Sequence, residues 1–231
     1  MNIIDHIFEP SRLYLVWHCT TEGNPHHRRI VGELFKDNDS VSFRYLKDTA
    51  DYALAEKEGF IGFPAFTMRG NEKFEDAIGV FLTRLPPRKR ADFSKYLAQY
   101  ALPSDFSGTD LALLGYTGAR LASDSFELCP DFSDVLHPVD LVLEVSGTQY
   151  NMAESMVLTE NEPVQFEAEP ENEHDSNAVA IHAQGGKLGY VSRAMNKSFK
   201  LLMARCTVTG SVLKFNHQQH RLQVMVLANC R

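Results

Sequence analysis

The chain has 231 residues, of which 44% are hydrophobic and 23% charged, a composition typical of globular proteins and not of disordered or fibrous ones. This length accommodates one large domain or two small ones, each with its own core. No apolar run approaches the roughly 18 residues of a membrane span. Residues 1–10 carry Asp5 and Glu9 and lack the basic end and apolar stretch of a signal peptide. We therefore expect a soluble, cytoplasmic protein without a membrane partner.

The four cysteines are widely scattered along the chain, and no two of them have the close spacing of a zinc cluster or a disulfide framework. Free thiols in a reducing cytosol are therefore predicted, and we expect neither a metal nor another cofactor. The cysteines are Cys19, Cys129, Cys206 and Cys230.

The net charge of −7 is unevenly distributed. Every Asp and Glu of the chain lies at or before Asp175, whereas the bases continue to Arg231. A local basic surface attracts phosphates even on an acidic molecule, because screening limits charge interactions to about 10 Å. A solvated helix face followed by a basic tail explains the same composition, so charge alone does not predict a nucleic-acid site.

The chain is expected to divide near residues 131–138, which are flanked by Pro130 and Pro138 and have no clear periodicity. The predicted organisation is a first domain over 1–130, a linker over 131–139 and a second domain over 140–231.

The first domain begins with strand-like segments. Residues 12–17 and 29–34 flank a polar turn that contains Gly23, Asn24 and Pro25, and residues 41–46 alternate strictly between apolar and polar. These three strands predict an antiparallel meander.

Helices are expected after the meander. Residues 48–58 are rich in Ala, Leu and Glu. Residues 88–102 have the apolar spacing of an amphipathic helix, with a double proline at the entry. A shorter helix is predicted over 109–116, ending near Gly118.

Two segments of this half carry a family resemblance. Phe81-Leu-Thr-Arg-Leu-Pro86 with Arg90, and more loosely residues 110–121, resemble the N-terminal region of HipA-type toxin kinases. The similarity covers about residues 12–128. No glycine-rich phosphate loop, buried lysine strand or magnesium-holding Asp/Asn pair follows it. The resemblance implies an antitoxin-like or regulatory subunit that docks on a kinase-like partner, and we expect no catalytic residues and no enzyme activity.

The sequence of the second domain predicts a small β-barrel. Six strands are predicted, over residues 141–145, 164–169, 178–183, 188–191, 208–215 and 222–227. One helix interrupts them, with Ser192 as its cap and Met195, Phe199 and Leu202 as its buried stripe. The fold class is therefore α+β: an N-terminal antiparallel sheet with helices, then an OB-like six-stranded barrel with one main helix. Such partly closed barrels often bind single-stranded nucleic acid.

The most informative segment is Glu169-Pro-Glu-Asn-Glu-His-Asp-Ser-Asn-Ala-Val179. It follows Val145-Ser-Gly-Thr-Gln-Tyr150 and precedes Lys187-Leu-Gly-Tyr-Val-Ser-Arg193. A tight polar connection between two strands explains part of it, since Asp and Asn side chains hold such turns by bonding their own backbone.

Together these three segments resemble the HIRAN domain, over about residues 141–228. This domain is found fused to DNA helicases and in many bacterial proteins. The resemblance implies capture of single-stranded DNA or DNA ends, including free 3′ ends. Tyr150 and His174 would stack on the terminal bases, and Asp175 would accept a hydrogen bond from the 3′-hydroxyl. The further predicted contacts are Asn172, Asn177, Tyr190, Arg193, Lys197 and Lys200.

Two departures weaken the end-binding expectation. His174 stands where the helicase form has a tyrosine, and Gln149 stands where it has an arginine. Plain DNA binding, or protein binding to a kinase-like or helicase-like partner, therefore remain open. The pairs His26-His27 and His217/His220 are interpreted as polar loops, the cluster 88–90 as a solvated helix start, and Trp17 as a core residue.

Overall fold

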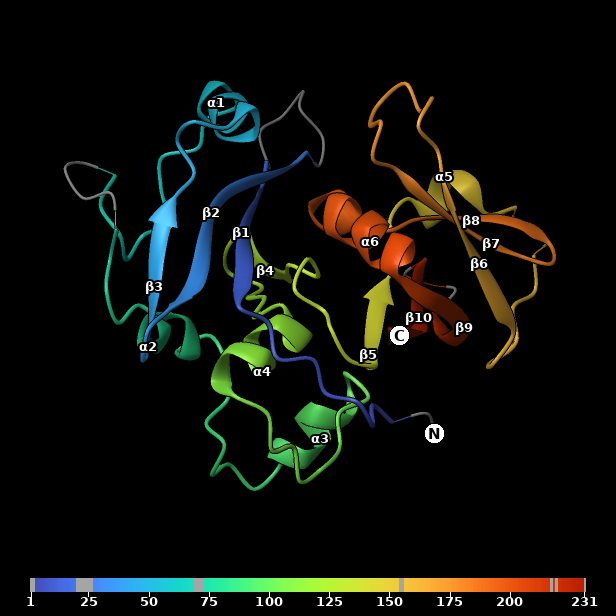
Figure 1. Cartoon of the computed structure of the whole chain (residues 1–231), viewed down its shortest axis with the longest axis horizontal. Coiled ribbons are helices and arrows are strands. Elements are labelled where there is room, and N and C mark those ends of the chain that lie inside the picture. Colours follow the sequence, from blue (N-terminus) through green and yellow to red (C-terminus); the bar gives the residue numbers. More distant parts are fainter. Residues whose placement is uncertain are drawn as a thin grey trace. The chain divides into compact units, whose positions relative to one another are not determined.

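The computed structural model describes residues 3–19, 27–68, 73–153, 156–216, 218 and 220–230. The chain forms two compact units. Unit 1 comprises Met1–Phe8, Ser94–Phe106 and Phe132–Arg231, and unit 2 comprises Glu9–Phe93 and Ser107–Asp131. Two stretches that lie inside the predicted first domain, residues 1–8 and 94–106, thus pack with the C-terminal part. The fold is α+β, as predicted (Figure 1).

Unit 2 is built on a four-stranded antiparallel sheet of order β3-β2-β1-β4. The predicted meander is confirmed, although its polar turn at 23–25 lies outside the described residues. The fourth strand was not predicted, because four of its five residues are buried and no alternation marks it. The strands are β1 (Arg12–His18), β2 (Arg28–Asp37), β3 (Ser40–Tyr45) and β4 (Phe126–Pro130).

The helices of unit 2 are α1 (Ala50–Lys57), α2 (Ile78–Leu82) and α4 (Asp110–Thr117). The predicted helices over 48–58 and 109–116 are therefore confirmed. Thr109 caps α4 by accepting a hydrogen bond from the amide of Ala112 (3.2 Å), and Gly118 ends it in the left-handed region with φ of 67°.

The predicted helix over 88–102 is wrong in its length, because α3 spans only Phe93–Ala98. It ends where Ala101 adopts a φ of 55° and the amide of Leu102 bonds back to the carbonyl of Leu97 at 3.1 Å. Both leucines are buried, and such an apolar contact commonly accompanies a left-handed helix end. The apolar spacing was compatible with a longer helix, but this reversal terminates it.

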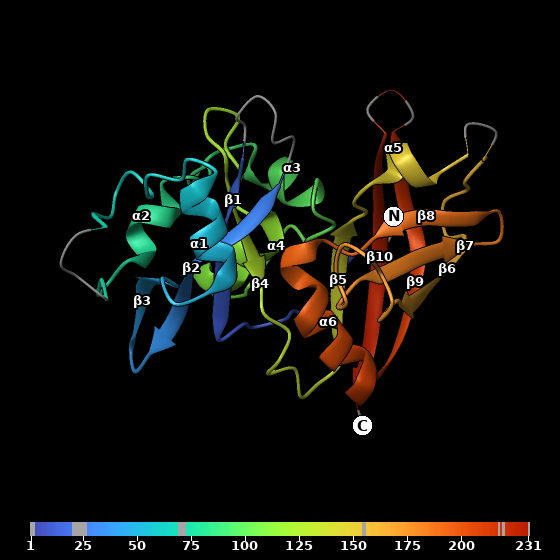
Figure 2. The ribbon, with the colours of Figure 1, turned by 90° about the horizontal axis from the view of Figure 1, so that it is seen from above.

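Unit 1 contains a six-stranded antiparallel sheet of order β5-β10-β9-β6-β7-β8, and all six predicted strands are confirmed. The sheet is not closed: among the described residues no ladder joins its edge strands β5 and β8, and the segment after β5 contacts β8 through an isolated bridge between Ser146 and Tyr190. Figure 2 shows β7 and β8 running across β9 and β10, as in a strongly curled sheet. The strands are β5 (Val139–Glu144), β6 (Pro163–Ala168), β7 (Val179–Ala183), β8 (Gly186–Tyr190), β9 (Cys206–Asn216) and β10 (Arg221–Cys230).

The main helix of unit 1, α6 (Arg193–Arg205), packs against β7, β9 and β10. Phe199 and Leu202 on its apolar stripe are fully buried, as predicted, whereas Met195 is only half-buried. Ser192 occupies the N-cap position, but its side chain makes no capping bond, which corrects the predicted cap.

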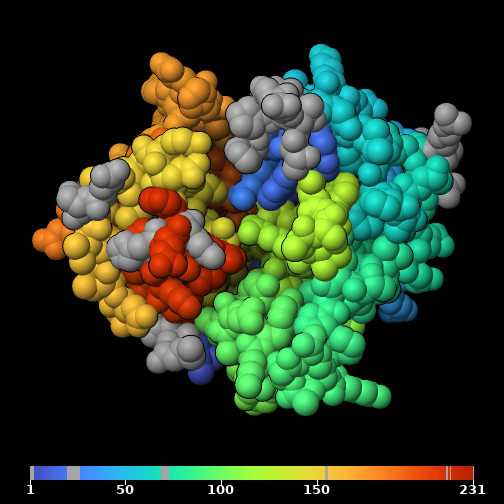
Figure 3. Space-filling view, turned by 180° about the vertical axis from the view of Figure 1, so that it is seen from behind, coloured from blue at the N-terminus to red at the C-terminus, as the bar shows by residue number. Residues whose placement is uncertain are grey.

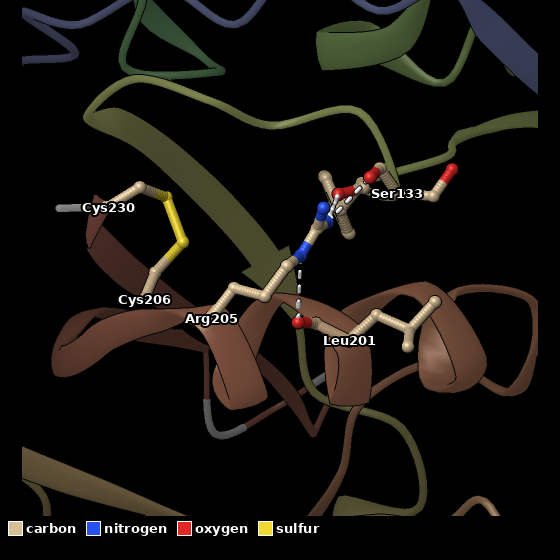
Figure 4. The surroundings of a disulfide bond; sticks show 6 residues. Ser133, Leu201, Arg205, Cys206 and Cys230 are labelled. Carbon is tan, nitrogen blue, oxygen red and sulfur yellow. Dashed lines mark hydrogen bonds between the residues drawn. A yellow bond between two sulfur atoms is a disulfide. The ribbon is translucent and has the colours of Figure 1, made fainter.

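The prediction of four free thiols is wrong, because Cys206 and Cys230 form a disulfide. They face each other across β9 and β10, although 24 positions separate them in the sequence. Figure 4 shows the bond at the end of α6, where the guanidinium of Arg205 donates to the carbonyl of Ser133 at 2.6 Å. Cys19 and Cys129 are free and buried.

None of the helices in the described part of the chain has the length and apolar character needed to cross a membrane.

Candidate nucleic-acid interface

The first predicted contact, Tyr150, lies on a short helix that the sequence did not predict, α5 (Thr148–Asn151). The helix starts at Gly147, whose φ of 75° suits glycine, and the side-chain Nδ2 of Asn151 donates to the Gly147 carbonyl at 2.7 Å. Thr148 donates to the carbonyl of His220 at 2.5 Å. The side chain of Tyr150 is left 80% exposed. A large ring thus stands in solvent on a helix whose base is fixed. In Figure 3 the yellow segment that includes α5 is exposed on this face and adjoins the orange segment.

The segment before α5 is joined to the end of β8. Ser146 and Tyr190 exchange backbone hydrogen bonds with N to O distances of 2.8 and 2.9 Å. Gly189 permits this approach, because a Cβ atom there would lie 2.4 Å from the Ser146 carbonyl oxygen. The glycine of the third motif segment is therefore required by packing, and it places α5 against β8.

The turn between β6 and β7 is held by its own side chains. The carbonyl oxygen of the Asn172 side chain accepts from the amides of His174 (3.0 Å) and Asp175 (3.2 Å). Asp175 Oδ1 accepts from the amide of Asn177 at 2.8 Å. Asn172 and Asp175 thus bond the backbone of their own turn, as expected for a tight polar connection between two strands. They also leave the His174 side chain exposed, so the backbone of the turn is fixed while its ring faces solvent.

Helix α6 fixes the other side of this turn. Asn196 donates to Asp175 Oδ2 at 2.9 Å, and Lys200 donates to the carbonyl of Ser176 at 3.1 Å. Lys200 is thus engaged with the turn, while Lys197 is exposed on the helix. Asn196 was not predicted as a site residue. Its position on the buried side of the helix, where only 3% of it is exposed, is the signal that points to a buried polar partner.

A charged network lies beside the turn and was also missed. Lys187 and Glu169 form an ion pair of 2.5 Å, and Tyr190 donates to the same carboxylate at 3.1 Å. Asn172 donates to it at 2.9 Å. The Lys187 ammonium lies 4.4 Å from the centre of the Tyr190 ring, within cation–π range. The three segments of the motif therefore meet at Tyr190.

This network shifts the pKa values of its charged members. The hydrogen bond from Lys187 is the main cause of the lowered pKa of Glu169. Burial lowers the pKa of Lys187, but its bonds to Glu169 and Tyr190 outweigh burial and raise the pKa. Both groups are held in their charged forms, which keeps the ion pair intact at neutral pH.

The acid-free C-terminal stretch is not a uniformly basic surface. Lys187 and Arg221 pair with Glu169 and Glu144, and Arg205 donates to backbone carbonyls. Arg193 is exposed at the first residue of α6. Composition overstated the positive charge, because acids from earlier in the chain reach these bases in the fold.

The other sequence candidates have local partners. His27 pairs with Glu58 at 2.9 Å, and Arg88 pairs with Asp110 at 2.7 Å. Trp17 is half-buried beside Phe60. His26 and His217 lie outside the described residues. Among the described residues, no group of three or more His, Cys, Asp or Glu side chains could hold a metal ion.

The C-terminal unit is thus an open, curled six-stranded sheet with one long helix, and three motif segments meet on it. Residues 139–228 match the family model of the HIRAN domain. The chain therefore carries a HIRAN domain over these residues, as the sequence predicted. The resemblance of residues 12–128 to HipA-type kinases lies outside this match and stays a prediction.

Two solved structures are similar to this part of the chain. One is a protein from Lactobacillus plantarum, with 27% identity, a TM-score of 0.36 and coverage of 41% of this chain and 97% of that chain. The other is the HIRAN domain of human HLTF, with 20% identity, a TM-score of 0.34 and coverage of 40% and 76%. No curated protein matches the chain significantly.

Proposed function

We propose that the HIRAN domain of this chain binds DNA, and that its ligand is a single strand with a free 3′ end. The observation that carries the proposal is Tyr150, whose aromatic ring is 80% exposed. The ring stands on a helix that is anchored to the β9–β10 connection through Thr148 and to β8 through Ser146. A tyrosine ring in solvent is a stacking platform, and base stacking tolerates any sequence because every base has a π-face. The role is one of binding, without a catalytic step.

The β6–β7 turn would hold the end of the strand. His174 would stack on a terminal base, and Asp175 would accept a hydrogen bond from the 3′-hydroxyl. The bonds from Asn177 and Asn196 use one acceptor site on each Asp175 oxygen, and each carboxylate oxygen has a second lone pair. The carboxylate can therefore accept a further donor without giving up the bonds that fix the turn.

Phosphate contacts would come from bases near this turn. Arg193 and Lys197 lie on the exposed side of α6, and Lys200 is already bound to the turn. In the proposed site Asn172 and Tyr190 position the turn, and the cationic side chains on α6 neutralise phosphates.

Fluorescence anisotropy with labelled oligonucleotides at low salt tests this proposal. We expect binding to single-stranded DNA that weakens as salt rises. An oligonucleotide with a 3′-phosphate should bind more weakly than one with a free 3′-hydroxyl, because the phosphate removes the donor and adds charge beside Asp175. Equal binding of the two would contradict end recognition and leave general DNA binding standing. No binding to any oligonucleotide would contradict the whole proposal.

A second candidate function, docking of a kinase-like protein on unit 2, is favoured by one surface feature. Ile61 is 90% exposed at a cavity of about 690 Å³ with a largely apolar lining, and exposed apolar surfaces often mark interaction sites. The lining residues are Ile61, Gly62, Phe63, Pro64, Phe66, Thr67 and Met68. Co-purification with a co-expressed kinase core tests this role, and Ile61→Asp should abolish it. If the wild-type protein also fails to capture the kinase core, the docking role is excluded.

A further inference from the structure

The end of the β9–β10 hairpin carries a polar face. Lys214 lies opposite Gln223, and Asn216 lies opposite Arg221 in the antiparallel register. Because side chains alternate between the faces of a strand, these four share one face. Leu222, which lies between Arg221 and Gln223 on β10, is fully buried on the other face. The hairpin end is therefore apolar toward the core and polar toward solvent.

This polar face lines a cavity of about 600 Å³. Most of its lining can donate or accept hydrogen bonds, and one aromatic ring, Tyr100, is present. The lining comes from residues 98–101 at the C-terminal end of α3, from the loop residues Glu160 and Asn161, and from Leu213, Lys214, Asn216, Arg221 and Gln223. All of these residues belong to unit 1. A cavity of this volume falls in the range that holds a small ligand, and a single nucleotide is of that size.

The cavity lining has one acidic residue, Glu160, and two basic residues, Lys214 and Arg221. An anion is favoured beside whichever base has no acidic partner. Arg221 is held by Glu144, with N to O distances of 2.9 and 3.1 Å. In the described part of the chain, Lys214 has no ion pair or hydrogen bond, and its side chain is exposed. Lys214 is therefore a cation that a phosphate can approach without displacing a carboxylate.

The cavity and the anchor of α5 lie at the same end of the β9–β10 hairpin. Thr148 donates to the carbonyl of His220, and Arg221, the next residue, lines the cavity. Tyr150 follows Thr148 by two residues on the same short helix. A strand that stacks on Tyr150 would therefore meet this end of the hairpin if it continues across it.

We propose that this cavity is a second subsite for the same DNA strand, holding an internal nucleotide. Its phosphate contacts Lys214, and its base edge faces the amide side chains of Gln99, Asn161 and Gln223. The subsite rests on the proposed function, since it needs a strand held at Tyr150. It differs from the end site in the part of the strand that it binds.

Oligonucleotide length separates the two sites. The wild-type protein should bind a ten-nucleotide strand at least several-fold more tightly than a three-nucleotide strand. Lys214→Ala should lose about three- to tenfold for the long strand and nothing for the short one. For Lys214→Ala, the slope of the logarithm of the binding constant against the logarithm of the salt concentration should be shallower by about 0.7. This is the value for one phosphate contact on a single strand. Lys214→Arg should retain the length effect. Lys95→Ala, which removes an exposed lysine of unit 1 outside the cavity, is the control for net charge.

Each other outcome has a definite meaning. If the wild type binds no oligonucleotide, the proposed function fails and the subsite fails with it. If the wild type binds but Lys214→Ala equals it at both lengths, the subsite is overturned and the end site stands. A loss of equal size for both lengths also overturns the subsite, because Lys214 would then contact the terminal nucleotide. A Lys95→Ala loss as large as that of Lys214→Ala would assign the effect to net charge and overturn the subsite too.

Discussion

The backbones of Ser146 and Tyr190 exchange two hydrogen bonds, of 2.8 and 2.9 Å, at the only point where the edges of the described six-stranded sheet meet. This bridge brings α5 to the end of β8. The hydroxyl of Tyr190 in turn contacts Glu169 at the start of the β6–β7 turn. Segments far apart in the sequence therefore form one surface through a contact that a single residue, Gly189, makes possible.

Replacing Gly189 with alanine should break this bridge. The position has a φ of 148°, and a Cβ there would lie 2.4 Å from a backbone oxygen, so neither the conformation nor the space suits alanine. We expect a loss of about 1–3 kcal/mol in the free energy of unfolding, measured by urea denaturation. Gly79→Ala is the matched control, because a Cβ at this helical glycine meets nothing within 4 Å. Equal stability of Gly189→Ala and the wild type would show that the approach is not required.

Replacing Tyr150 should affect DNA binding without affecting the fold. Tyr150→Ala removes the stacking ring and should cost about 1–3 kcal/mol of binding free energy, which is roughly a 5- to 150-fold rise in Kd. Because the side chain is 80% exposed, the melting temperature should hardly change. Tyr150→Phe keeps the ring and should bind like the wild type. A Phe variant as weak as the Ala variant would assign the effect to the hydroxyl and not to stacking.

Replacing Lys187 should release Glu169. In Lys187→Met the carboxylate loses its ion pair, so its pKa should rise from its lowered value, which carboxyl NMR titration can measure. A lowered folded-state pKa stabilises the fold above the ordinary glutamate pKa, and this contribution is lost as pH falls through the lowered value. The variant should therefore lose less stability than the wild type on acidification.

The same variant also tests positioning of the turn. We expect Lys187→Met to weaken oligonucleotide binding several-fold, since Glu169 also holds Asn172. Lys187→Arg should restore both the pKa and the binding. An unchanged titration of Glu169 would contradict the role assigned to Lys187.

A buried carboxylate should make unit 2 sensitive to acid. Glu127 contacts His18 at 2.8 Å and also pairs with Arg28 and Arg120. Burial raises the pKa of Glu127, but the bond to His18 and the two arginines outweigh burial and lower the pKa from 4.5 to about 2. The pKa is depressed in the folded state, so its stabilisation, on the order of 3 kcal/mol, is complete above pH 4.5 and lost toward pH 2.

Glu127→Gln tests this pH dependence. It should be less stable than the wild type at neutral pH, because Arg28 and Arg120 lose the buried counter-charge that they contact. Its stability should fall less between pH 5 and pH 3, as measured by urea unfolding. Parallel pH profiles for the two proteins would show that Glu127 does not titrate in this range.

Local patterns account for what could be predicted from the sequence. Alternation located the strand at 164–169 and an apolar run the strand at 141–145. The polar chemistry of the β6–β7 turn indicated Asp175, whose side chain does hold it, whereas Asn177 contributes its backbone amide. Contacts between distant segments were not predicted. The pairing of Lys187 with Glu169 depends on strand register, and that of Asn196 with Asp175 depends on where a helix packs. The local sequence of each segment does not identify the distant partner.

The disulfide is a further distant contact with a measurable consequence. Cys206 opens β9 and Cys230 ends β10, so the bond closes the hairpin at the end opposite its turn. For a loop closed by residues 24 apart, loss of chain entropy in the unfolded state predicts a stabilisation of about 3.5 kcal/mol. Reduction by a dithiol should lower stability by that order, measured by urea unfolding with and without the reductant.

Two further measurements make this prediction specific. The double variant Cys206→Ser/Cys230→Ser should have the stability of the reduced wild type and should not respond to the dithiol. DNA affinity of the folded protein should be the same in both states, because Arg221 and Cys230 lie at opposite ends of β10, about 30 Å apart at roughly 3.3 Å per residue. Binding that changes with reduction while the protein stays folded would show that the hairpin transmits the state of the disulfide to α5. If the free energy of unfolding of the wild type is the same with and without the dithiol, the stabilising role of the bond is contradicted.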